Sequence, residues 1–372
     1  QRRISLLKPP RFFTPLRSVQ NDMNIHSFLT ATSSETPPSA GVKKILIWHQ
    51  GALGDLLLAG PALEALSRHY AGARITALGH PERWSLLALS LPLDEVWDSG
   101  EARWVHLFSD GDMPPPIREF LARFQLALIF GPHPQAILQD RLRLAGIPAV
   151  HWLPSFPETD VEAVAALQAR HLAGLGLNYV PGPFKLEMGL DPEAELPELP
   201  GPGPWLAVAP GSGSLRKNWP LAHYYEVSRA LGWEYGLRVV WLAGPAEGEM
   251  LPYLGPLAKA QGHLLLANRP LARVARVLSR CRLYIGNDSG LTHLAAAVAG
   301  PEVLALFGPT DPRVWAPLGP HVRTLRAPCL QPPEAVDGTI SFPETRCLNA
   351  LSPETVLAAA QVLAAPGEVG GE

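Results

Sequence analysis

Cysteine is scarce in this chain, and the spacing of the few cysteines excludes the usual zinc motifs. The 372 residues contain three cysteines, Cys281, Cys329 and Cys347, and none of them forms a CxxC pair. A zinc site is therefore not expected. So low a count fits a reducing compartment, and we expect free thiols there; a Cys329–Cys347 disulfide is the alternative.

Charge is also sparse and nearly balanced. Charged residues make up 17% of the chain, with 31 basic and 34 acidic side chains and a net charge of −3. A dedicated nucleic-acid-binding protein would be strongly basic, so nucleic acid is not an expected partner. No stretch of about 18 uncharged apolar residues occurs, so no transmembrane helix is expected.

What the sequence does contain is enough apolar material for a core and many loop-forming residues. Hydrophobic residues make up 47% of the chain, and the 40 prolines and 33 glycines together stay below the content of a low-complexity chain. At roughly 100–200 residues per domain, the length suggests two domains or at most three.

Residues 1–42 differ from the rest of the chain. The first twenty residues carry five basic side chains and no acidic one, and Ser, Thr and Pro dominate residues 30–40. This composition superficially resembles an organelle transit peptide. We expect instead a disordered extension or a misplaced start, with Met23 as the alternative first residue. The segment has no apolar core of a secretory signal.

From residue 43 onward, short apolar runs alternate with helical patterns. In the first half the expected strands are residues 44–48, 74–78, 126–130 and 148–152, and the expected helices are residues 55–70, 117–124 and 135–145. Such alternation predicts a parallel sheet covered by helices on both faces.

A Pro-rich segment, residues 181–204, is the expected linker to a second cycle of the same kind. The expected strands there are residues 205–209, 237–242, 263–267, 282–285 and 302–307, and the expected helices are residues 222–231, 271–280, 291–299 and 353–363. Ser352 is the expected cap of the last helix. The predicted fold class is therefore α/β, with two doubly wound Rossmann-like domains, 43–180 and 205–350, facing a cleft at the carboxyl ends of their strands.

The first motif, residues 49–55 (HQGALGD), directly follows the first strand. Its two glycines permit a tight turn and close approach of the backbone. Asp55 at the mouth of the cleft is a candidate general base toward a hydroxyl group, and the alternative is a helix cap. The motif is not GxGxxG, and no acidic residue closes the second strand, which argues against a dinucleotide site.

The second motif, residues 210–220 (PGSGSLRKNWP), follows the first strand of the second half. Its small and hydroxyl residues Ser212, Gly213 and Ser214 allow backbone amides to approach a phosphate, and Lys217 adds positive charge. The alternative is a solvated loop. The motif lacks the GxxxxGK[ST] pattern of a Walker A loop.

The third motif, residues 286–293 (GNDSGLTH), ends one strand and opens a helix. Asp288 or Ser289 is the expected cap, and the free amides of this helix start, with Gly290, would suit a diphosphate. His293 lies in the first turn, where the alternative is a buried helical histidine. Glu247, after another strand, is a candidate for ribose hydroxyl groups or for complementing a helix dipole.

Together these motifs resemble the heptosyltransferases of bacterial lipopolysaccharide synthesis, glycosyltransferase family nine. The resemblance covers about residues 43–364 and is carried by GALGDLLLAGPALEAL, PGSGSLRKNWP, GPAEGE, NDSGLTHLAAAVAGPEVLALFGPTDP and the late cysteine pair. It implies the GT-B architecture of two Rossmann-like domains, with the C-terminal helix of residues 351–372 crossing back to the first domain. It also implies an ADP-heptose donor and inversion at the anomeric carbon, with no cofactor and no metal.

The resemblance also implies roles for particular residues. Asp55 matches the family's proposed base, and Lys217 matches the lysine that contacts the donor phosphates. The other implied donor-binding residues are Gly54, Ser212, Gly213, Ser214, Glu247, Asp288, Ser289, Gly290 and His293.

The expected function is thus transfer of heptose to a lipopolysaccharide-core or related glycan acceptor by a monomeric cytoplasmic enzyme. A nucleotide-sugar epimerase of the same architecture and a non-catalytic binding module are the alternatives. A lipid-linked acceptor would require peripheral contact with the inner membrane. The candidates for an anionic acceptor are Arg68, Arg83, Arg141 and Arg143, and those for membrane contact are Trp84, Trp97 and Trp104, with core packing as the alternative for the tryptophans.

Overall fold

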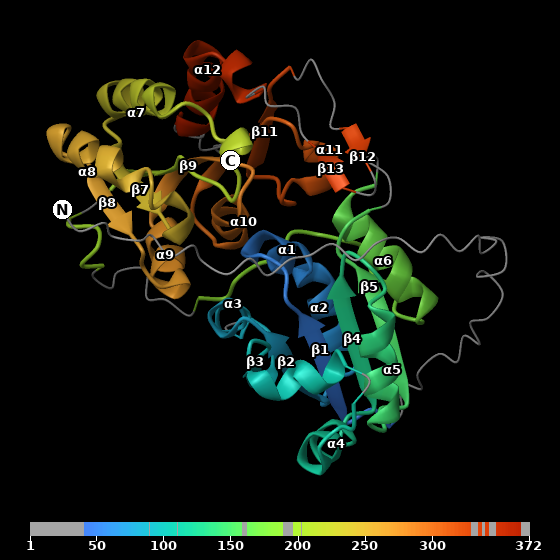
Figure 1. Cartoon of the computed structure of the whole chain (residues 1–372). Helices are drawn as coiled ribbons and strands as arrows, with labels where there is room; N and C mark the ends of the chain where they lie inside the picture. The colour runs from blue at the N-terminus through green and yellow to red at the C-terminus, as the bar shows by residue number, and fades with distance from the viewer. Residues whose placement is uncertain are drawn as a thin grey trace, which may run out of the picture. The chain divides into compact units, whose positions relative to one another are not determined.

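The computed structural model describes residues 41–88, 90–109, 111–157, 162–188, 196–201, 203–328, 334–336, 339–341 and 347–365. The predicted N-terminal extension and its Met23 start lie outside these ranges. The described chain forms two α/β lobes, the first containing β1 to α6 and the second containing β6 to α12 (Figure 1).

The first lobe is built on a five-stranded parallel sheet in the order β3-β2-β1-β4-β5. Its strands are β1 (Lys44–His49), β2 (Arg74–Gly79), β3 (Leu93–Asp98), β4 (Leu126–Gly131) and β5 (Ala149–Pro154). Its helices are α1 (Leu53–Leu58), α2 (Gly60–His69), α3 (Pro81–Leu87), the 3₁₀ helix η2 (Ala102–Leu107), α4 (Pro115–Leu121), α5 (Ala136–Leu144) and α6 (Val164–Gly174). The sequence correctly predicts four of these strands.

The second lobe repeats the plan with a six-stranded parallel sheet in the order β11-β10-β9-β6-β7-β8. Its strands are β6 (Trp205–Ala209), β7 (Arg238–Ala243), β8 (Leu264–Ala267), β9 (Cys281–Asn287), β10 (Glu302–Phe307) and β11 (Val322–Arg326). Its helices are η3 (Leu215–Lys217), α7 (Leu221–Tyr235), η4 (Pro245–Glu247), α8 (Leu251–Ala260), α9 (Leu271–Leu278), α10 (Gly290–Ala297), α11 (Pro312–Trp315), η5 (Cys347–Ala350) and α12 (Pro353–Ala364). The short strands β12 (Glu334–Val336) and β13 (Thr339–Ser341) pair antiparallel with each other.

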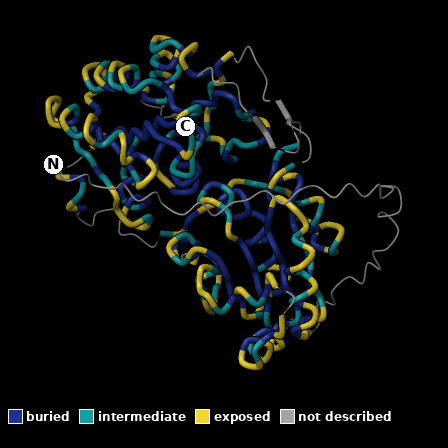
Figure 2. The backbone as a smooth tube through the Cα atoms, in the orientation of Figure 1, coloured by how far each residue is buried: buried dark blue, intermediate teal, exposed yellow. Residues whose placement is uncertain are grey.

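Each central strand is buried on both faces, as expected for a doubly wound sheet. In β1, Ile45 and Ile47 belong to the core cluster that includes α2, whereas Leu46 and Trp48 face α4 and α5 on the other side. Figure 2 shows the strands as buried and the outer sides of the helices as exposed. The two-residue alternation of side chains along β1 therefore fills two separate hydrophobic layers.

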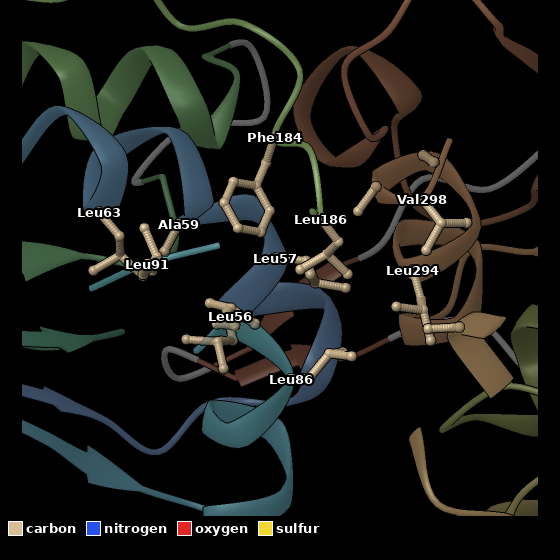
Figure 3. Close-up of a cluster of buried hydrophobic side chains, with 14 of the residues drawn as sticks. Leu56, Leu57, Ala59, Leu63, Leu86, Leu91, Phe184, Leu186, Leu294 and Val298 are labelled. Carbon is tan, nitrogen blue, oxygen red and sulfur yellow. The ribbon is translucent and has the colours of Figure 1, made fainter. Parts of the chain in front are cut away.

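The segment after α6 is packed against both lobes. Phe184 covers Gly60, where a Cβ atom would lie only 2.3 Å from the Phe184 Cγ atom. The Leu186 N–H donates to the carbonyl of Ala297 at 2.8 Å. Figure 3 shows Leu186 between Leu57 of α1 and Leu294 of α10. Phe184 and Leu186 of the predicted linker are thus part of the hydrophobic core.

One expectation about the C-terminal helix is wrong. Ser352 caps α12 as predicted, with its Oγ accepting from the Thr355 N–H at 3.3 Å. The helix does not cross back to the first lobe, because its buried face (Val356, Ala360) packs into the core of the second lobe beside α7 (Figure 1). Within the ranges given above, no helix combines the length and apolarity needed to cross a membrane.

Candidate active site

A cleft with a volume of about 720 Å³ opens where the carboxyl ends of the strands of both sheets face each other. The loops after β6, β7, β8 and β9 supply most of its wall. The first lobe contributes Leu53 at the start of α1 and three residues at the start of α3, namely His80, Glu82 and Arg83. The site therefore lies at the switch points where doubly wound sheets bind their ligands, as predicted.

Asp55 is in the first turn of α1, three residues after the N-cap position, which Ala52 occupies. The Asp55 Oδ2 atom accepts a hydrogen bond from the Ala52 N–H at 2.9 Å. Both alternatives for this residue therefore have a structural basis: the carboxylate satisfies a free amide of the helix start, and Leu53 in the same helix turn lines the cleft. Burial raises the pKa of Asp55, opposed by the Ala52 hydrogen bond and the positive charge of Lys217, so its carboxylate is a stronger base than an exposed one.

Lys217 forms an ion pair with Asp288 across 71 residues of sequence. The Lys217 Nζ atom lies 2.7 Å from Asp288 Oδ2, which also accepts from the Thr310 hydroxyl at 2.7 Å. The Asp288 side chain is 8% exposed and the Lys217 side chain is 26% exposed, so the carboxylate is buried and the lysine is only partly covered. The structure thus brings the two predicted residues together.

The loop that carries Ser212 and Ser214 is folded on itself by hydrogen bonds. The Ser212 Oγ atom lies 2.7 Å from both the Ser214 carbonyl and Asn218 Oδ1, and it accepts from the Ser214 N–H at 3.2 Å. Ser212 and Gly213 line the cleft, and a Cβ atom on Gly213 would meet nothing within 4 Å. This loop is therefore open to a ligand on the Gly213 side.

Asn287 supports the same loop, and sequence reasoning did not assign it a role. Its side chain is fully buried and accepts from the Trp219 N–H at 3.0 Å and from the Tyr224 hydroxyl at 2.8 Å. Its Nδ2 atom donates to the Pro210 carbonyl at 2.8 Å. Asn287 therefore ties both ends of the 210–219 loop to the end of β9, and its only sequence signal is its place beside Asp288 at a strand end.

The start of α10 meets the start of α1 without an intervening side chain. Ser289 is the N-cap residue of α10, but its side chain makes no capping hydrogen bond. A Cβ atom on Gly54 would lie 3.1 Å from His293 Cδ2 and 3.6 Å from the Gly290 Cα atom. Burial lowers the pKa of His293 to about 4, so the imidazole at this contact is neutral at neutral pH.

Glu247 closes the far side of the cleft. Its Oε2 atom accepts from the Gly244 N–H at 2.6 Å, and its side chain lies against Gly211, where a Cβ atom would approach Glu247 Oε1 to 2.2 Å. The carboxylate is 7% exposed and lines the cleft. Beyond it, Leu242, Leu266 and Val274 form an apolar part of the wall. The arrangement offers hydrogen-bond acceptors beside a hydrophobic hollow, which suits a nucleoside.

Other side chains considered from the sequence have different roles. Of the four arginines, only Arg83 lines the cleft. Arg68 pairs with Glu64 at 3.5 Å on the surface of α2, Arg141 donates to the His106 and Gly111 carbonyls, and Arg143 donates to the Val150 carbonyl.

The tryptophans considered for membrane contact are mainly core residues. Trp84 and Trp104 are 0% and 2% exposed, and Trp97 packs edge-on against Trp104 at 6.2 Å under the guanidinium of Arg103.

The cysteines correct another expectation. Cys347 is disulfide-bonded, so the expectation of free thiols is wrong for this residue, whereas Cys281 is a free and buried thiol. Cys329 lies outside the described residues.

Solved structures with the same fold define the class of the chain. The glycosyltransferase family 9 protein of Veillonella parvula superposes with a TM-score of 0.65 and 18% identity, over 87% of this chain and 97% of that one. The E. coli heptosyltransferase WaaC with ADP superposes with a TM-score of 0.61 and 18% identity, over 86% of this chain and 99% of that one. Two Rossmann-like lobes around a cleft therefore define the GT-B glycosyltransferase fold here, as predicted.

Sequence comparison shows similarity to one family of glycosyltransferases. The family model for glycosyltransferase family 9 (heptosyltransferase) matches residues 157–340. Lipopolysaccharide heptosyltransferase 1 of Pseudomonas aeruginosa is 35% identical over 152 residues, 40% of this chain and 41% of the relative. Lipopolysaccharide heptosyltransferase 2 of Salmonella typhimurium is 34% identical over 129 residues, which are 33% of this chain and 36% of that relative. The alignments thus span about two fifths of these curated relatives, and the predicted resemblance to family 9 is confirmed.

Proposed function

We propose that this protein is an inverting, metal-independent glycosyltransferase that moves heptose from ADP-heptose to a lipopolysaccharide-core acceptor, with Asp55 as general base. The observation that carries the proposal is the position of Asp55, a partly buried carboxylate of raised pKa, two residues after Leu53 of the cleft wall and within the electrostatic reach of Lys217 and Asp288. This pairing of a base with a cationic group is what a displacement reaction at a sugar diphosphate requires.

The donor is proposed from the wall of the cleft. The apolar hollow at Leu242 and Leu266 suits an adenine ring, and the Glu247 carboxylate suits the ribose hydroxyl groups. The amides around Gly213 and the start of α10 at Gly290 suit the diphosphate. Two solved structures of E. coli WaaC are those with ADP and with ADP-2-deoxy-2-fluoro heptose, which supports the same donor class for this chain.

The proposed reaction balances as a single displacement. The oxygen of an acceptor hydroxyl group attacks the anomeric carbon from the face opposite the diphosphate, and the bond from that carbon to the phosphate oxygen breaks. The proton of the hydroxyl group passes to Asp55, which contributes about 10²–10⁴-fold in rate for such a transfer. Lys217 and the amide groups stabilise the charge that grows on the leaving ADP, with preorganised donors typically contributing about 3–4 kcal/mol each.

The proposal also implies an acceptor and a place in the cell where the protein acts. The relatives are named lipopolysaccharide and lipooligosaccharide heptosyltransferases, so we propose an oligosaccharide on a lipid anchor as acceptor. The protein would then act as a monomer at the cytoplasmic face of the inner membrane. Arg83 is the one predicted cation that lines the cleft and can meet an anionic acceptor group there.

A direct assay tests the proposal. Purified protein is incubated with ADP-heptose and lipopolysaccharide from heptose-deficient cells, with and without EDTA, and the anomeric configuration of the product is determined by NMR. The proposal expects transfer with inversion that EDTA leaves unchanged. Conversion of the donor in the absence of acceptor would instead support an epimerase, and failure to bind ADP-, UDP- and GDP-sugars in thermal-shift measurements would support a binding module.

A further inference from the structure

The position of the Asp55 carboxylate depends on a single turn, formed by Gly51 and Ala52 and called the Gly51 turn below. The Ala52 N–H is the donor that holds Asp55 Oδ2 at 2.9 Å. A Cβ atom on Gly51 would lie 3.0 Å from the same oxygen, so the turn and the carboxylate are in direct contact. Any displacement of the Gly51 turn would therefore move the carboxylate.

Two side chains hold the Gly51 turn at its two polar groups. The Gly51 N–H donates to His49 Nδ1 at 3.2 Å, and the Gly51 carbonyl accepts from Arg83 Nη1 at 2.7 Å. His49 ends β1, whereas Arg83 lies 32 residues later on α3. Both polar groups of Gly51 are thus bonded to side chains from two different elements.

The His49 ring is held in its neutral form, which the hydrogen bond from the Gly51 N–H to Nδ1 requires. The residue is 2% exposed, and its ring lies edge-on to Trp84 at 6.4 Å and tilted against Phe130 at 5.5 Å. Burial lowers the pKa of His49 to about 4. The ring is therefore neutral at neutral pH, with Nδ1 free of a proton as the acceptor and the proton on Nε2, which has no hydrogen-bond partner within the described part of the chain.

Arg83 is held at the rim of the cleft by its helix. The residue before it, Glu82, accepts from the Leu271 N–H at 2.8 Å, which joins α3 of the first lobe to the start of α9 in the second. The positive charge of Arg83 favours the ionised form of Asp55 and so lowers its pKa.

Other charged groups act on Asp55 as well. Lys217 acts in the same direction as Arg83, and Asp288 acts in the opposite direction. The two nearby imidazoles, His49 and His293, are neutral at neutral pH because burial lowers the pKa of each to about 4. Arg83 is the only one of these charged groups that is also bonded to the Gly51 turn.

We propose that His49 and Arg83 are positioning residues that fix the Asp55 carboxylate through the Gly51 turn. This inference rests on the proposed role of Asp55 as the base. It adds two residues that act through another group and do not themselves take the proton.

The test uses variants that separate geometry from charge. Arg83→Gln removes the charge and Arg83→Lys keeps it, whereas His49→Leu removes the Nδ1 acceptor and His49→Asn retains an acceptor at a similar position. Arg74→Gln is the matched control, because Arg74 lies at the amino end of β2, away from the cleft, and pairs with Asp94 at 3.7 Å.

Heptose transfer is measured as kcat and KM for ADP-heptose. The titration of Asp55 is followed separately by ¹³C NMR on the protein alone, with the resonance assigned through Asp55→Asn.

The expected losses fall on kcat, because a misplaced base affects the reacting geometry more than the binding of the donor. Arg83→Gln and His49→Leu should each lower kcat by about 10- to 100-fold. Arg83→Gln should also move the Asp55 titration to higher pH, and Arg83→Lys should restore that titration. His49→Asn should recover most of the kcat lost in His49→Leu, and it remains informative if the leucine variant does not fold.

The outcomes distinguish this inference from the proposed function. An inactive Asp55→Asn combined with wild-type kcat and titration in Arg83→Gln would overturn the positioning role while leaving the base in place. An active Asp55→Asn would overturn the proposed function. The NMR titration would still show in that case whether Arg83 acts on the carboxylate.

Discussion

Gly290 of the second lobe lies so close to Gly54 of the first lobe that position 290 does not accept a side chain. A Cβ atom on Gly290 would lie 3.2 Å from the Gly54 backbone nitrogen and 2.9 Å from the Leu53 Cβ atom. The neighbouring atoms belong to backbone and to the root of a side chain, so they cannot yield by rotation. This contact brings the Asp55 helix of the first lobe against the helix start proposed to bind the diphosphate.

The first prediction follows from that contact. Gly290→Ala should separate the starts of α1 and α10 and lower transfer activity, and overpacking of this kind typically costs about 1–3 kcal/mol of unfolding free energy. Chemical denaturation and the transfer assay measure the two effects. Gly174→Ala is the control, because a Cβ atom there meets nothing within 4 Å and Gly174 is far from the cleft at the end of α6. Equal activity of both variants would show that the close contact is unimportant.

The second prediction concerns the Lys217–Asp288 pair. Lys217→Ala should weaken ADP binding by about 10- to 100-fold, the range expected for losing a charge-assisted hydrogen bond. Isothermal titration calorimetry with ADP measures this directly, and Lys259→Ala on the exposed side of α8 serves as the control for a lost charge. An unchanged ADP affinity would contradict the phosphate-binding role.

The third prediction uses the contact between Gly211 and Glu247. A methyl group on Gly211 would lie about where the Glu247 carboxylate now sits, 2.2 Å from Oε1. Gly211→Ala should therefore displace Glu247 and weaken ADP binding at least as much as Glu247→Ala does. Glu247→Gln keeps an acceptor for the Gly244 N–H and should bind ADP more tightly than Glu247→Ala. Wild-type affinity in Gly211→Ala would remove Glu247 from the donor site.

The fourth prediction concerns stability in acid. Burial lowers the pKa of His49 and of His293 from 6.5 to about 4 in the folded state. The unfolded chain takes up these protons first, so the free energy of unfolding should fall as the pH drops from about 6.5 to about 4, by about 3 kcal/mol for each histidine. Asp55 changes the free energy of unfolding in the opposite direction as the pH falls. Its raised pKa lets the folded state take up a proton before the unfolded chain does.

Urea denaturation at several pH values measures this dependence. His49→Asn should reduce the acid dependence, since it removes one of the two histidines with the most strongly lowered pKa. His69→Asn, on the exposed end of α2, is the matched control for the exchange of histidine for asparagine. A free energy of unfolding that stays constant between pH 6.5 and pH 5 would contradict the buried neutral state of both imidazoles.

The sequence predicts the parts of the fold whose patterns are local and strong. Buried strands such as β1 and β10 are continuous apolar runs, and their loops carry the site motifs. Edge strand β3 was missed because its residues, LDEVWD, are partly exposed and acidic. Helix α8 was missed because Pro252, Gly255 and Pro256 interrupt its pattern. The expected single helix of residues 55–70 is two helices, α1 and α2, with Pro61 in the first turn of the second.

The candidate site divides in the same way, into residues that a local pattern predicts and contacts that it does not. Asp55, Lys217, Glu247 and Asp288 could be proposed as site residues from the sequence because each lies in a segment of distinctive composition that follows an apolar strand. The contacts that hold these residues in place could not be predicted, because they join segments that are distant in the sequence. Arg83 reaches Gly51 over 32 residues, and Asn287 reaches Trp219 over 68. No local pattern encodes such a contact; only the packing of the sheets brings the partners together.

The most direct test of the central claim is the turnover of Asp55→Asn with ADP-heptose and heptose-deficient lipopolysaccharide. The substitution keeps the size of the side chain and an acceptor for the Ala52 N–H, but it removes the group that takes the proton. We expect transfer to fall by about 10²–10⁴-fold, with ADP affinity close to that of the wild type by calorimetry. Transfer at a rate near that of the wild type would contradict the account.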